Sequence, residues 1–156
     1  MPYVQKKKKD FHLGELSVQG TRYPDVLKLW LSLKHLGALT YSKLIDDSYE
    51  KTQLLKSNML KKNYLKIACE PSMNIICFRG EPDYIPRIDH DKWNCDLQKY
   101  LLKKHKIFFS ISKYKGSKWL RAVILNPFFS MSNINNILKG IDDFFQKNNN
   151  LKKDYA

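Results

Sequence analysis

Arg121 is the residue whose type and position point most directly to a binding role. It lies in the run Trp119-Leu-Arg-Ala-Val-Ile-Leu125, whose alternation predicts a strand with Trp119, Arg121, Val123 and Leu125 on one face. A guanidinium group can hold a carboxylate through two parallel hydrogen bonds. The sequence therefore predicts that Arg121 binds an anionic ligand, and a salt bridge at the rim of a sheet is the alternative.

Gly20 and Thr21 form a second candidate site, just ahead of the first predicted helix. Pro24 is typical of the first position of a helix, where its missing N–H has no intrahelical partner. Backbone N–H groups at a helix N-terminus bind phosphate readily. A turn followed by an N-cap explains the same residues equally well, so both interpretations stay open.

The remaining reactive side chains form no catalytic or metal-binding pattern. The three cysteines are odd in number and lack a C-x-x-C pair, which indicates a reducing cytoplasm without a disulfide framework or a zinc site. His12, His35 and His105 fit no catalytic arrangement. We therefore expect neither a metal ion nor a catalytic residue in this chain.

Composition limits the possible classes of protein. The chain has 156 residues, of which 43% are hydrophobic, enough for a domain with a real core. No apolar run approaches the roughly 20 residues that span a bilayer. No apolar h-region follows the N-terminal lysines, so we do not expect a signal peptide. The net charge of +13 has two explanations, lysines spread over solvent-facing helix surfaces or an affinity for nucleic acid or anionic membranes. Nucleic acid is nevertheless an unlikely partner, because no known motif is present and aromatic residues do not alternate with the basic clusters.

The pattern of apolar residues predicts an α+β domain. Helices are expected at 24–36, ending at Gly37, then from Thr40, from Asp91 as an N-cap, and at 134–145. Strands are expected at 64–68, 74–79, 107–114 and 118–125, with a tight turn at Lys115-Gly116. Strand pairs separated by single helices indicate an antiparallel or mixed sheet covered by helices on one side. We expect a single domain over 1–156, with an irregular lead-in (1–16), linking helices (17–60), a sheet-plus-helix part (61–147) and a polar tail (148–156). The helix at 24–36 should be buried on much of its circumference.

Three segments resemble the group II pyridoxal-phosphate-dependent amino-acid decarboxylases, in an order that fits a collinear alignment. The first contains Gln19-Gly-Thr-Arg22 and Asp25-Val-Leu-Lys-Leu-Trp30. The second, Asn74-Ile-Ile-Cys-Phe78, is similar to the middle strand of that family. The third, Trp119 to Pro127, resembles its late strand, in which an arginine precedes Asn-Pro.

The resemblance implies a fold, a reaction and partners. The fold would be the C-terminal small domain of a fold-type I pyridoxal-phosphate enzyme, a mostly antiparallel sheet of about four strands after a linking helix. The reaction would be decarboxylation of an amino acid on pyridoxal 5'-phosphate, with Arg121 at the substrate carboxylate and Gly20 and Thr21 near the cofactor phosphate. The complete enzyme would be a cytoplasmic homodimer. The resemblance identifies neither the amino acid nor a role for Arg22.

The lysine that binds the cofactor is not expected in this chain. Asp89-His-Asp-Lys-Trp93 superficially resembles the family's His-Lys-Trp motif, but it carries an extra aspartate and lies downstream of Gly20 rather than upstream. The family's lysine would precede the position that matches Met1. We therefore expect that the chain needs an upstream cofactor domain or chain and is inactive alone. A non-catalytic protein-interaction module or remnant, and a basic nucleic-acid-binding domain, are the alternatives.

Overall fold

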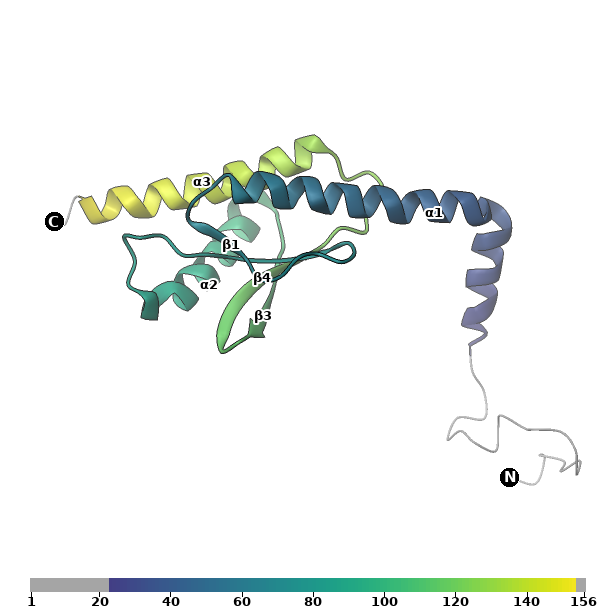
Figure 1. Cartoon of the computed structure of the whole chain (residues 1–156), viewed down its shortest axis with the longest axis horizontal. Helices are drawn as coiled ribbons and strands as arrows, with labels where there is room; N and C mark the ends of the chain where they lie inside the picture. The colour runs from purple at the N-terminus through teal and green to yellow at the C-terminus, as the bar shows by residue number, and fades with distance from the viewer. Residues whose placement is uncertain (1–22, 154–156) are drawn as a thin grey trace, which may run out of the picture. The chain divides into compact units, whose positions relative to one another are not determined.

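The computed structural model describes residues 23–153 (Figure 1). The chain separates into two compact units, residues 1–39 and 40–156. The helix α1, Asp25–Leu60, includes the boundary between them, and its backbone leaves the helical conformation at Gly37, with φ 78° and ψ 158°. Glycine adopts a positive φ without the steric cost that a Cβ brings. The predicted end of the first helix at Gly37 is thus confirmed.

The helical residues of the first unit expose their apolar side chains. Val26, Leu29, Trp30, Leu33 and Leu36 are between 40% and 71% exposed. The burial that we predicted for this helix is therefore not found within the described residues. The spacing of these residues creates an apolar stripe, but a stripe is buried only where another segment packs on it.

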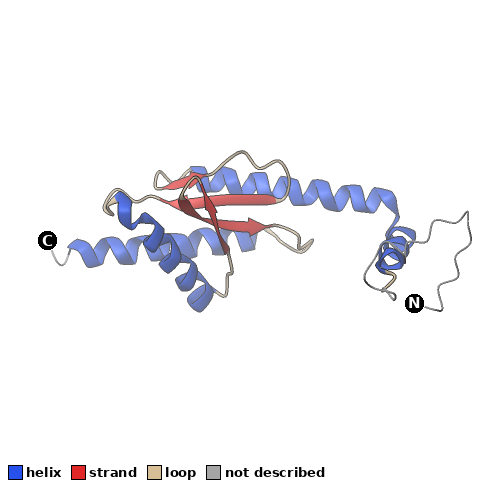
Figure 2. Cartoon of the chain, turned by 90° about the horizontal axis from the view of Figure 1, so that it is seen from below, coloured by secondary structure: helices blue, strands red, loops and turns tan. Residues whose placement is uncertain are grey.

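The second unit contains one sheet of four antiparallel strands in the order β1-β2-β4-β3. The strands are β1 (Leu65–Ile67), β2 (Ile75–Gly80), β3 (Ser110–Tyr114) and β4 (Ser117–Val123), drawn in red in Figure 2. All four lie within the segments predicted as strands, apart from the last residue of β2 and the first of β4. The apolar run of β2 predicted an interior strand, and β2 indeed lies between β1 and β4.

A two-residue turn joins β3 to β4. Tyr114 pairs with Ser117, and the turn residues Lys115 and Gly116 have φ values of 48° and 79°. Two successive positive φ values match the twist of the flanking strands. The turn predicted at this dipeptide is confirmed, and it sets the register that places Arg121 opposite Ser110.

The helices of the second unit differ from prediction at their ends. The helix α2, His90–Tyr100, follows a 3-10 turn over Arg87–Asp89 and continues into a π-helical turn over Leu101–His105. Asp91 is thus inside the helix, and its predicted role as N-cap is wrong. The last helix, α3, covers Met131–Lys153 and extends into the segment predicted as a polar tail.

All the helices contribute to one core on one face of the sheet. Its fully buried side chains come from α1, the strands, α2, the π-helical turn and α3, and include Leu55, Met59, Ile76, Phe78, Leu97, Leu101, Leu120, Ile134 and Ile141. The opposite face carries Cys77, Trp119 and Arg121, which are half-buried, and Val123, which is exposed. The α+β prediction is confirmed, and Arg121 lies on the face away from the core.

Candidate functional site

Arg121 lies in the middle of the sheet's outer face. It is on β4, opposite Cys77 of β2 on one side and Ser110 of β3 on the other. Trp119 and Val123 share its face because side chains two residues apart on a strand point the same way. The structure therefore places Arg121 on the predicted strand and face.

No carboxylate of residues 23–150 lies within ion-pair distance of Arg121. The ion pairs in this part of the chain involve other cations, among them Lys56 with Glu70, Lys62 with Asp142, and Arg79 with Glu81 and Asp91. The alternative prediction of a rim salt bridge thus finds no partner among these residues. Within this part of the chain, the guanidinium charge is therefore not paired with a carboxylate.

Arg121 borders a cavity of about 370 Å³. The cavity lies where β3 begins, beyond the end of β4 and beside the start of α3. Its lining includes Phe108, Val123, Leu125 and Phe129, together with the amides of Asn126, Asn133 and Asn136. Among the described residues that line it, Arg121 alone is charged.

The thiol of Cys77 adjoins Arg121 across the strands. Burial raises the pKa of this thiol and the neighbouring Cys69 adds to the rise, whereas Arg121 acts in the opposite direction. The net result is a raised pKa, so Cys77 stays neutral at physiological pH. A neutral thiol does not neutralise the positive charge of Arg121.

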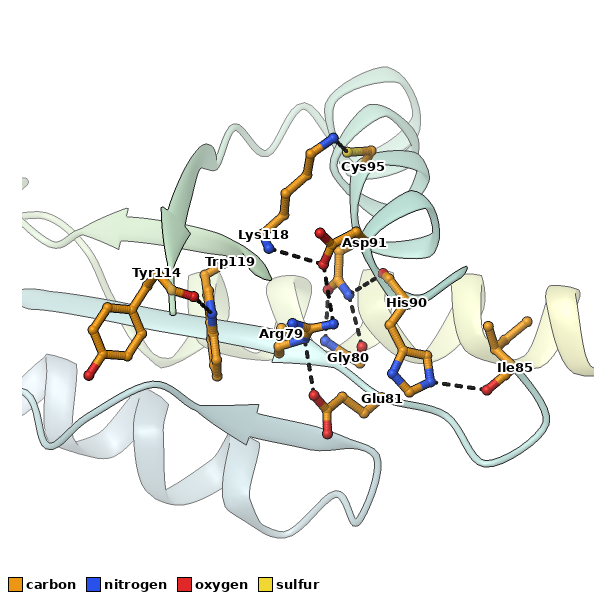
Figure 3. Close-up of polar contacts among 11 residues, drawn as sticks. Arg79, Gly80, Glu81, Ile85, His90, Asp91, Cys95, Tyr114, Lys118 and Trp119 are labelled. Carbon is orange, nitrogen blue, oxygen red and sulfur yellow. Dashed lines mark hydrogen bonds and ion pairs between the residues drawn. The ribbon is translucent and has the colours of Figure 1, made fainter. Parts of the chain in front are cut away.

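A second arginine, Arg79, is buried and forms two ion pairs, which the sequence did not indicate (Figure 3). It is only 5% exposed, with its Nε 3.1 Å from Glu81 Oε1 and its Nη2 3.3 Å from Asp91 Oδ1. Its guanidinium also lies 5.5 Å from the centre of the Trp119 ring. Asp91 Oδ1 in turn accepts the backbone N–H of Lys118 at 3.0 Å. These contacts connect β2, α2 and β4, and so hold the strand that carries Arg121.

Gly80 and Asn94 fix α2 against the end of β2. The Asn94 side chain accepts the N–H of Gly80 at 2.7 Å and donates to the carbonyls of Gly80 and His90 at 2.8 and 2.7 Å. A Cβ on Gly80 would lie 2.0 Å from a ring atom of Trp93. Only glycine allows this close approach, so the residue after Arg79 is constrained by packing.

The other candidate residues lie away from this cavity or outside the described residues. Gly20, Thr21, Arg22 and His12 precede residue 23, so their predicted roles stay predictions. His35 is exposed, and His105 lies 3.7 Å from a carboxylate oxygen of Asp143.

Lys92 is exposed and lines a separate cavity of about 240 Å³, and no lysine of residues 23–150 lines the cavity at Arg121. In the same part of the chain, no cluster of His, Cys, Asp and Glu is arranged to hold a metal ion. Over residues 23–153, none of the helices has the length and apolar character needed to span a membrane.

Similarity to curated proteins identifies the relatives of this chain. It is 26% identical over 127 residues to an L-2,4-diaminobutyrate decarboxylase of Acinetobacter baumannii, covering 81% of this chain and 25% of that protein. It is also 26% identical over 136 residues to the cysteine sulfinic acid decarboxylase of Mus musculus, covering 80% and 27%. This chain is a relative of the group II pyridoxal-phosphate-dependent amino-acid decarboxylases. It spans about a quarter of the length of the curated decarboxylases that it matches, and no family model matches it.

Solved structures of decarboxylases share the fold. The structure of mouse CSAD in apo form superposes with a TM-score of 0.74 at 23% identity, over 91% of this chain and 32% of that one. Oryza sativa TDC with PLP superposes with a TM-score of 0.78 at 18% identity, over 86% and 29%. The four-stranded sheet and its helices match the C-terminal domain of such decarboxylases. The fold expected from the resemblance is confirmed.

The described lining of the cavity at Arg121 lacks one group that binding of pyridoxal phosphate requires. Covalent attachment of pyridoxal phosphate needs a lysine amine whose pKa the site depresses. The cavity at Arg121 has no lysine in its described lining. The one charged residue of this described lining is Arg121, which has no carboxylate partner among residues 23–150. We therefore assign no cofactor-binding step to residues 23–153.

Proposed function

We propose that this chain forms the C-terminal part of a pyridoxal-phosphate-dependent amino-acid decarboxylase and that Arg121 binds the substrate carboxylate. The observation that carries the proposal is that Arg121 lines a cavity in which it is the one charged residue of the described lining, and that it has no carboxylate partner among residues 23–150. A planar guanidinium orients a carboxylate through two hydrogen bonds, which a point charge does not do. Arg121 would thus set the angle at which the amino acid meets the cofactor.

The rest of the site belongs to this proposal as well. Pyridoxal phosphate, when bound, supplies the electron sink for loss of CO2. Gly20 and Thr21 would donate backbone N–H groups to its phosphate, and another part of the enzyme would supply the lysine. We further propose a homodimer in the cytoplasm.

One observation favours a second candidate, a protein-interaction module. The exposed stripe that contains Leu29, Trp30 and Leu33 suits a protein partner, since exposed apolar patches of this kind mark interaction sites. The complete decarboxylase would itself supply such a partner, so the stripe is compatible with both candidates. The net charge of +13 is the only support for nucleic-acid binding, and we do not propose that function.

Kinetics with the cofactor-binding part of a related decarboxylase would test the proposal. The chain is combined with that part, and Arg121→Lys is compared with the unchanged chain. We expect kcat/KM to fall about 30-fold, which corresponds to about 2 kcal/mol for a charged hydrogen bond. Lys113→Gln, at an exposed cation of the same hairpin, serves as the control and should leave kcat/KM unchanged. Unchanged kinetics with a lower melting temperature for Arg121→Lys would make Arg121 a purely structural residue.

A further inference from the structure

We propose that the outer edge of β3 is a docking site for an extended acidic segment of a partner protein, which adds to the sheet as a further strand. The inference is independent of the proposed decarboxylase function, since it involves neither Arg121 nor the cofactor. Three features carry it: the backbone groups along this edge, the positive charge around it and a repulsion inside the β3–β4 hairpin.

The backbone along one side of β3 is not used by the sheet. Among the described residues, β4 is the one neighbour of β3, which makes β3 an edge strand (Figure 1). Tyr114 and Ser117 flank the two-residue turn, and the pair that closes such a turn exchanges backbone hydrogen bonds. Bonded and non-bonded pairs alternate along an antiparallel ladder, so Ile111 and Lys113 direct their N–H and C=O groups away from β4. No other segment of residues 23–150 hydrogen-bonds to these groups, which can therefore pair with an added strand.

The length of this edge suits one short strand. At its beginning, the carbonyl of Phe109 accepts the side-chain amide of Gln98 at 3.2 Å, so α2 covers the edge there. At its end lies the turn. Between these limits Ile111 is 41% exposed and Lys113 is exposed. The uncovered part thus corresponds to β3 itself, which has the five-residue length common for a strand.

The segment that contains this edge carries no negative charge of its own. Residues 97–141 contain no aspartate or glutamate, whereas Lys106 lies ahead of the strand and Lys113, Lys115 and Lys118 lie in the hairpin. The three hairpin lysines have no carboxylate within ion-pair distance among residues 23–150. The edge is therefore complementary in charge to an acidic strand.

The hairpin also contains a repulsion that an acidic strand would offset. Lys113 lies directly opposite Lys118, and like charges in this position destabilise a strand pair. The carboxylate of Asp91 accepts the backbone N–H of Lys118, but it forms its ion pair with Arg79. The ammonium group of Lys118 instead lies 3.4 Å from the thiol sulfur of Cys95. A carboxylate on a strand beside β3 would give Lys113 an opposite charge on its other side.

The same features disfavour two other occupants. A second copy of β3 would bring two sets of Lys113 and Lys115 together, and edge lysines are a common protection against such self-pairing. Single-stranded nucleic acid needs open aromatic faces on which bases stack. Here Lys115 lies 5.4 Å from the ring centre of Tyr114, Arg79 lies 5.5 Å from that of Trp119, and the two rings meet edge-on at 6.3 Å (Figure 3). These contacts use ring surface that a base would need.

Titration of the full chain with short capped peptides tests the inference. The probe is Glu-Val-Glu-Val-Glu, which alternates charge with a β-branched residue. Lys-Val-Lys-Val-Lys reverses its charge, and Glu-Pro-Glu-Pro-Glu keeps the charge but lacks N–H groups at its prolines. We expect the probe to bind with a Kd below about 1 mM at low salt and both controls to bind at least about tenfold more weakly. On binding, amide hydrogen exchange should slow at Ile111 and Lys113, and it should not change at Ser112, which already pairs with β4.

Variants of the chain separate the backbone contribution from the charge. Ile111→Pro removes one outward N–H and leaves the ladder to β4 intact, since proline is tolerated at such edge positions. It should weaken binding of the probe about tenfold or more, whereas Ile111→Val keeps the N–H and should bind normally. Lys113→Glu should weaken binding severalfold. Its control, Lys43→Glu, makes the same charge change at an exposed position of α1 and should have little effect.

Each outcome decides one part of the inference. Normal binding of the probe by Ile111→Pro, or equal binding of the proline peptide, would show that the contact is electrostatic only and that strand addition is wrong. If Ile111→Pro lowers the melting temperature, the proline peptide and the exchange pattern still decide this point. Equal binding of the lysine peptide would refute the charge complementarity. Tighter binding of a single-stranded oligodeoxythymidine than of the probe, or no binding of the probe at millimolar concentration, would overturn the inference.

Discussion

Gly80→Ala is predicted to destabilise the second unit strongly, although it adds only one methyl group. The new Cβ would lie 2.0, 2.7 and 2.9 Å from three ring atoms of Trp93. Optimal carbon–carbon contacts are at about 3.5–4.0 Å, so the ring would have to move by roughly 1.5 Å. Trp93 is 5% exposed and packs edge-on against Phe144 at 5.1 Å, so moving the ring would disturb this packing. We expect a cost of about 3 kcal/mol, at the upper end for overpacking.

Thermal and urea unfolding followed by circular dichroism would measure this cost. A loss of about 3 kcal/mol should lower the melting temperature by roughly 10 °C in a unit of this size. Gly140→Ala is the matched control. Its Cβ would meet the flexible end of Leu101 at 2.7 Å and two ring atoms of His105 at 3.1 Å, none closer than 2.7 Å, and it would lie in a helix, where alanine is favoured. We expect the control to change stability by less than about 1 kcal/mol.

A double-mutant cycle with Trp93→Leu then isolates the contact. In the Trp93→Leu background, Gly80→Ala should cost about 2 kcal/mol less than in the unchanged chain, because the ring is gone. An equal cost in both backgrounds, or an unchanged melting temperature for Gly80→Ala, would refute the steric explanation.

Two further predictions concern the buried polar groups. Asn94→Leu should cost about 3 kcal/mol in urea unfolding, because it leaves the N–H and carbonyl of Gly80 and the carbonyl of His90 without their partner; a cost below about 1 kcal/mol would contradict this. Stability should also fall above pH 10 through Tyr64, whose pKa is raised above its ordinary value of 10.0 by burial and by its hydrogen bond to Asp142. The unfolded chain then loses this proton first, so the contribution of Tyr64 is complete below pH 10 and falls by roughly 1.4 kcal/mol per pH unit above it. Tyr64→Phe should reduce the slope of stability against pH by that amount, and equal slopes would show that Tyr64 does not titrate in this way.

Local sequence features determined much of the fold and the position of Arg121. The sequence predicted the helix end at Gly37 and the tight turn at Lys115-Gly116, because these backbone conformations depend on neighbouring atoms alone. The alternation around Arg121 predicted its strand and its face, because side chains on a strand alternate whatever the strand packs against. These patterns involve only residues close together in the sequence, so they predict the local structure without knowledge of the fold.

Contacts between distant segments could only be found in the tertiary structure. The predicted cap at Asp91 was wrong because this carboxylate pairs with Arg79 and with the N–H of Lys118, which is 27 residues away. The burial of Arg79 depends on three separate elements, and no local pattern indicates such an arrangement. The same holds for the cavity, which exists because β3 and β4 separate beyond Arg121 while α3 closes one side. The sequence thus determined which residue presents the charge, and the packing of distant segments decided what surrounds it.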